Sequence, residues 1–77
     1  MPTLLYIFGL RFFFYSEEHP PIHVHVQNGD GRAKPDVLTG TVIENNGLKI
    51  KDLNRAIDAI KTYKDDFVKA WNEYFDE

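Results

Sequence analysis

The order of residue patterns along the chain predicts an α+β domain, with a mostly antiparallel sheet of three to five short strands followed by two C-terminal amphipathic helices packed on one face. Residues 1–47 are rich in β-forming residues and turn tetrapeptides, whereas residues 48–77 show helical periodicity. A length of 77 residues corresponds to a single domain, so both halves should share one core. Its expected members are Ile22, Val24, Val26, Ile50, Leu53, Ile57, Ile60, Phe67 and Trp71.

The first predicted strand region covers residues 3–15 and is apolar on both faces. Gly9 interrupts it, which indicates either one strand bent by a bulge or two short strands. Residues 22–27 then alternate, so that Val24 and its apolar neighbours face one side while His23, His25 and a glutamine face the other. This pattern predicts a half-buried strand that carries the histidines on its polar, solvent-facing side.

Turn signals separate the remaining strands. Residues 28–31, with the sequence Asn-Gly-Asp-Gly, predict a hairpin that leads into a strand over residues 32–38. Pro35 within that strand suggests an edge position, because proline cannot donate to a sheet. A second tight turn at residues 39–40 precedes a strand over residues 41–44, and residues 45–47 close the sheet region.

Two helices are expected after Leu48. Apolar residues recur at helical spacing from Ile50 to Ile60, and a break near Tyr63 separates this helix from the next. The apolar stripe of the second helix consists of Phe67, Trp71, Tyr74 and Phe75.

Composition limits the possible functions. The chain lacks cysteine, which excludes disulfides, thiolate metal sites and a cysteine nucleophile. A domain of this size often gains stability from a metal ion or from association, and these two routes remain open. The net charge of −3 does not indicate a nucleic-acid binder by bulk charge. With no recognisable targeting or membrane-spanning segment, the expected location is the cytoplasm, without membrane contact.

All three histidines fall within residues 19–25. His23 and His25 are two residues apart on a predicted strand, so their side chains share a face. His19 precedes a Pro-Pro pair and could complete a three-histidine site for zinc or nickel, with water, Glu17 or Glu18 as the fourth ligand. Exposed histidines on a strand are also frequent as ordinary polar surface, and this interpretation stays open.

The second chemical interpretation needs no cofactor. His23 and His25 could act as general base and general acid in phosphodiester cleavage, most plausibly of RNA. Arg32 and Lys34 follow the predicted hairpin, and Arg11 lies in the first strand region, so these three cations could hold the phosphate. This metal-independent site is the preferred chemical hypothesis. A non-catalytic protein-interaction module is the alternative, and exposed aromatic residues on residues 4–15 or on the second helix would favour it.

Several of these elements also carry a resemblance. The chain begins Met1-Pro2-Thr3, continues through Gly9 and Phe13-Phe14 to His19-Pro20-Pro21-Ile22-His23-Val24-His25, and ends near Ala70-Trp71-Asn72-Glu73-Tyr74. In these features it resembles the small bacterial proteins of domain-of-unknown-function family 4160. The resemblance transfers no activity. It implies an organisation similar to toxin–antitoxin modules, with a small neighbour-encoded partner or self-association, and it places the site at His19, His23 and His25.

Overall fold

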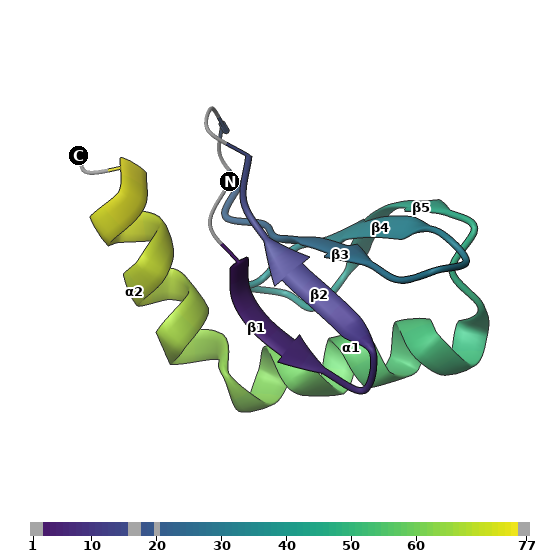
Figure 1. The fold of residues 1–77 in the computed structure, drawn as a ribbon. Coiled ribbons are helices and arrows are strands. Elements are labelled where there is room, and N and C mark those ends of the chain that lie inside the picture. Colours follow the sequence, from purple (N-terminus) through teal and green to yellow (C-terminus); the bar gives the residue numbers. More distant parts are fainter. Residues whose placement is uncertain (1–2, 16–17, 20, 76–77) are drawn as a thin grey trace.

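The computed structural model describes residues 3–15, 18–19 and 21–75, and within them it contains five strands and two helices. The strands form one antiparallel sheet in which each strand pairs with its neighbour in the chain (Figure 1). The predicted α+β class and the order of strands before helices are confirmed. In chain order the elements are β1 (Thr3–Ile7), β2 (Leu10–Phe13), β3 (His25–Gln27), β4 (Arg32–Pro35), β5 (Val42–Asn46), α1 (Ile50–Thr62) and α2 (Lys64–Phe75).

The interruption at Gly9 is a hairpin turn. β1 and β2 pair from Ile7 and Leu10 outward, which leaves Phe8 and Gly9 as a two-residue loop. Both loop residues have positive φ, 57° and 74°, as a tight primed turn requires. Of the two expected alternatives, the structure therefore has two short strands and no bulge at this glycine.

β4 is an interior strand, so the edge position expected from Pro35 is wrong. It pairs with β3 on one side and with β5 on the other. Pro35 is tolerated because the ladder is irregular at this point, where the register shifts between Lys34 and Pro35. The Pro35 carbonyl still accepts a hydrogen bond from the Val24 N–H at 3.2 Å.

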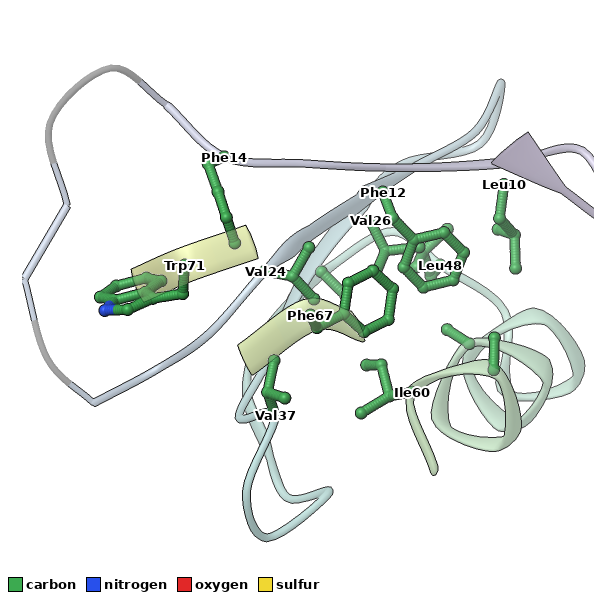
Figure 2. Close-up of a cluster of buried hydrophobic side chains, with 13 residues drawn as sticks. Leu10, Phe12, Phe14, Val24, Val26, Val37, Leu48, Ile60, Phe67 and Trp71 are labelled. Carbon is green, nitrogen blue, oxygen red and sulfur yellow. The ribbon is translucent and has the colours of Figure 1, made fainter. Parts of the chain in front are cut away.

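The core lies between one face of the sheet and the helices. Phe12 of β2 stacks on Phe67 of α2 with ring centroids 5.7 Å apart, and Phe14 meets Trp71 edge-on at 5.4 Å. Figure 2 shows Val24, Val26, Val37 and Ile60 in the same cluster. The predicted core residues Val24, Val26, Ile60, Phe67 and Trp71 are confirmed as buried.

The other predicted core residues are less enclosed. Ile22, Leu53 and Ile57 are only partly buried. Ile50 is 75% exposed, which contradicts its expected place in the core. It is the first residue of α1, and at this end of the helix its side chain is open to solvent.

The β3–β4 loop packs tightly against the end of β5. The Asn28 carboxamide oxygen accepts hydrogen bonds from the backbone N–H groups of Asp30 and Gly31. A Cβ placed on Gly31 would collide with the Asn46 carbonyl oxygen and with the backbone of Gly47. Glycine is therefore required at position 31 by space.

Neither α1 nor α2, the helices of the described residues, is long and apolar enough to cross a membrane.

Candidate functional site

His23 and His25 lie on the predicted side of their strand but are not solvent-facing. Val24 is fully buried on the helix side, as the alternation predicts, yet His23 and His25 are only 4% and 8% exposed. The expectation of an open polar face at this position is wrong. The segment that precedes the strand places Glu18 over both imidazoles, and the Tyr15 and Trp71 rings pack against them at 4.3 and 5.3 Å.

Glu18 joins the two histidines through a single carboxylate. Its Oε1 lies 2.8 Å from His23 Nε2, and its Oε2 lies 2.8 Å from His25 Nε2. The backbone N–H of Tyr15 donates to Oε2 at 2.9 Å. The Glu18 side chain is 8% exposed, and this largely buried carboxylate is held by the Tyr15 N–H and by hydrogen bonds with both imidazoles.

His23 is held at both ring nitrogens. Its Nδ1–H donates to the Pro21 carbonyl oxygen at 2.7 Å while Nε2 faces Glu18. This assignment follows from the partners, since a carbonyl can only accept. The stiff Pro21 backbone thereby fixes the orientation of the ring.

The surroundings lower the pKa of both the Glu18 carboxyl and the His25 imidazole. Burial by itself would raise the pKa of the Glu18 carboxyl, but the Tyr15 N–H, the His23 hydrogen bond and the charges of both imidazoles together lower it. Burial lowers the pKa of the His25 imidazole, and the nearby charges of His23 and Lys34 act in the same direction. The Glu18 carboxylate opposes this shift without cancelling it.

The predicted phosphate-binding cations share the sheet face opposite to the helices. Arg11, Gln27 and Arg32 form one row across β2, β3 and β4. The Arg11 guanidinium lies 4.4 Å from the centre of the Phe13 ring, and Arg32 donates to the Tyr15 hydroxyl at 2.6 Å. The expectation that these cations lie on the same face as His23 and His25 is therefore met by the strand register.

A groove of about 560 Å³ opens beside the histidines at the β3–β4–β5 end of this face. Lys34 lines this groove together with Glu18 and His23. Lys34 follows Arg32 by two residues on β4, so both side chains lie on the same face of the sheet. His19 is exposed and lines the same groove. The full lining comprises Glu18, His19, Pro21, His23, Lys34, Asp36, Thr39, Thr41 and Ile43.

The group of potential metal ligands differs from the predicted set. Glu18, His23 and His25 each offer one ligand atom, and these atoms all lie within 4.8 Å of one another. Among the described residues His19 is not part of this group, and Glu18 takes the position expected for it. Glu17, the other proposed carboxylate, lies outside the described residues.

Acid–base chemistry by the two histidines meets a geometric obstacle. Both Nε2 atoms point at the same carboxylate, and His23 Nδ1 is also engaged. A substrate would have to displace Glu18 before both rings could exchange protons with it. The assignment of general acid and general base to His23 and His25 stays a prediction.

The sequence pattern indicates the histidines and cations but not the central role of Glu18. Glu18 appeared only as one of two possible fourth ligands, although its position five residues before His23 was a usable indication. The contributions of Tyr15 and Pro21 come from backbone groups, and no side-chain pattern reveals these.

A sequence model for the family described as "Domain of unknown function (DUF4160)" matches residues 9–72. No curated protein and no solved structure gives a match.

Proposed function

Since this chain belongs to the DUF4160 family, whose description names no activity, we propose its function from its geometry: the sheet face opposite to the helices binds the phosphates of single-stranded RNA. The observation that carries the proposal is the shared face of Arg11, Arg32 and Lys34 around His25 and Tyr15. Such a protein, acting with a small partner, would form one component of a toxin–antitoxin-type module.

Two tyrosine rings lie next to the cations on this face. Tyr6 pairs with Arg11 across β1 and β2, so it shares their face, and it is 70% exposed. Tyr15 is half-buried and hydrogen-bonded to Arg32. Unpaired bases stack on tyrosine rings, whereas phosphates contact arginine and lysine. A face that carries both kinds of side chain therefore suits single-stranded RNA.

The electrostatic attraction should be moderate. The net charge is −3, and Glu44 faces Lys34 across β4 and β5. Adjacent strands are about 4.8 Å apart, so Arg11 on β2 and Arg32 on β4 have backbones roughly 10 Å apart. A patch this small neutralises only a few phosphates, and binding should weaken steeply with salt.

The RNA prediction is tested by titrating a labelled oligouridylate of about ten nucleotides at several salt concentrations. Replacing Arg32 and Lys34 together with alanine should reduce the slope of log affinity against log salt by about 1.4, which is about 0.7 for each lost phosphate contact. Lys51→Ala/Lys69→Ala is the matched control, because Lys51 and Lys69 are exposed cations of α1 and α2 and their joint loss changes the net charge by the same two units.

Equal weakening by Lys51→Ala/Lys69→Ala would reduce the effect to bulk charge, and absence of binding by the unaltered chain would refute the proposal. Gel analysis of the same mixtures, with His23→Ala and His25→Ala variants confirmed as folded, tests cleavage. Cleavage that persists in both variants would remove the acid–base roles.

A partner-dependent interaction module is the second candidate, and Phe8 favours it. This side chain is 60% exposed and its φ is 57°. Both conditions are unusual for a bulky aromatic residue. A positive φ is more common for glycine or asparagine. A large apolar side chain that is exposed to solvent is typical of a protein interface. β1 is also an edge strand of the sheet and can accept a partner strand.

Phe8→Asn should therefore leave the fold intact or stabilise it by a few tenths of a kcal/mol, while it weakens association by at least about tenfold. Sedimentation of the purified chain, alone and with the protein encoded next to it, measures the association. An unchanged complex in the Phe8→Asn variant, or a monomer with no affinity for that protein, would contradict this candidate.

A further inference from the structure

We propose that Glu18, His23 and His25 form a binding site for one divalent transition-metal ion, with zinc or nickel as the expected class, open on one side to the adjacent groove. The proposal concerns ions and does not depend on RNA binding.

The donor atoms already converge. Each Nε2 lies 2.8 Å from an oxygen of Glu18, and all three ligand atoms fall within 4.8 Å. Bonds to zinc of about 2.1 Å in tetrahedral geometry place ligand atoms about 3.4 Å apart. Side-chain rotations that move these atoms by roughly 1 Å therefore suffice, and the ion would replace the two hydrogen bonds to Nε2.

The surroundings orient two of the ligands for this role. A histidine that binds a metal usually donates its other N–H to a carbonyl or carboxylate, as His23 Nδ1 donates to the Pro21 carbonyl oxygen. The Tyr15 N–H holds Glu18 Oε2, so Oε1 can turn to the ion while the carboxylate stays anchored. These contacts select the Nε2 atom of His23 and one oxygen of Glu18.

Burial of the cluster needs a reason beyond fold stability. The side chains of Glu18, His23 and His25 are 8%, 5% and 10% exposed. A buried carboxylate adds little stability, because loss of its hydration offsets the attraction to its hydrogen-bond partners. Metal binding would offset that cost directly, in a chain too small to gain much from its core.

The ligand types restrict the choice of ion. Two imidazoles and one carboxylate are the ligand set of several catalytic zinc centres, whereas Mg²⁺ and Ca²⁺ prefer oxygen ligands throughout. Glu18 and His23 line the groove together with Asp36, Thr39 and Thr41. The fourth coordination position of the ion would therefore be open to a water molecule from the groove.

Calorimetric titration of the full chain with zinc tests the site, and absorption spectra of the Co²⁺ form report its geometry. We expect one equivalent of zinc to bind, no heat from Mg²⁺, and shifts of the His23 and His25 ring resonances but not of His19. Glu18→Gln and His25→Ala should each weaken zinc binding by at least about 100-fold, above the 10–100-fold effect of an outer-shell partner.

His19→Ala is the matched control, because His19 lines the same groove but lies outside the cluster. It should bind zinc with an affinity within about twofold of that of the unaltered chain, a smaller change than the loss of one typical hydrogen bond would cause. Arg11→Ala should also bind zinc normally, because Arg11 lies on the proposed RNA face but is outside the cluster and does not line its groove.

Absence of binding at about 1 mM zinc would overturn the proposal, because any binding free energy would then be weaker than about −4 kcal/mol. Equal loss in His19→Ala would overturn it as well and would indicate the three-histidine set instead. If His25→Ala fails to fold, Glu18→Gln decides, because it keeps the size and shape of the side chain.

Discussion

Gly31→Ala is expected to destabilise the protein by about 3 kcal/mol or more, the upper range for overpacking. The added methyl group would overlap the carbonyl oxygen of Asn46 and the backbone of Gly47. Rotation of a side chain cannot relieve this overlap, because the atoms concerned belong to the backbone. The loop or the end of β5 must move instead. A chain of this size has about 4–12 kcal/mol of total stability, so the fraction lost is large.

Gly29→Ala is the control within the same loop. A Cβ at position 29 meets nothing within 4 Å, so the change should stay within about 0.5 kcal/mol. Trp71 is the only tryptophan of the chain and is 7% exposed, and its fluorescence during urea unfolding reports both variants. Equal stability of the two variants would mean that the loop does not pack on β5 as described.

Glu18→Ala should cost about 3 kcal/mol in the presence of EDTA, when no metal contributes, because each buried polar group left without its partner costs about 1–3 kcal/mol. The substitution leaves two nearly buried imidazole Nε2 atoms and the Tyr15 N–H without their acceptor. Position 18 also loses its link to β3 through His25.

Two further variants separate this effect from loss of charge or of side-chain volume. Glu18→Gln keeps one acceptor oxygen and should lose only about 1 kcal/mol. Glu73→Ala removes an exposed carboxylate of α2 and should stay within about 0.5 kcal/mol. Urea midpoints for the three variants, read from Trp71, give the comparison. A Glu18→Ala midpoint equal to that of Glu73→Ala would show that the carboxylate does not bridge the histidines.

Much of the fold could be predicted because local patterns specify it. Alternation in residues 22–27, glycine-rich turns and the helical spacing from Ile50 to Ile60 each need only a short window. The role of Pro35 could not be predicted, since a proline at a register shift resembles one at an edge. Ile50 was misplaced because periodicity gives the face of a helix but not where its contact with the sheet begins.

The candidate site shows the opposite balance. Residue types alone drew attention to His23, His25 and the cations Arg32 and Lys34, and the register placed them together. The burial of the histidines could not be predicted from alternation, because it depends on Tyr15, Glu18 and Trp71, which the tertiary structure places against them. Glu18 lies outside the strands, so its hydrogen-bond partners are set by the tertiary structure and not by strand periodicity.

The pairing of every strand with its sequence neighbour also has a kinetic consequence. Such a sheet can form by successive closure of short hairpins, which gives a low contact order and favours rapid folding compared with sheets built from distant segments. The slower step is then the docking of α2, because Phe67 must reach Phe12 across most of the chain. Folding of this domain should thus be limited by the arrival of its last helix.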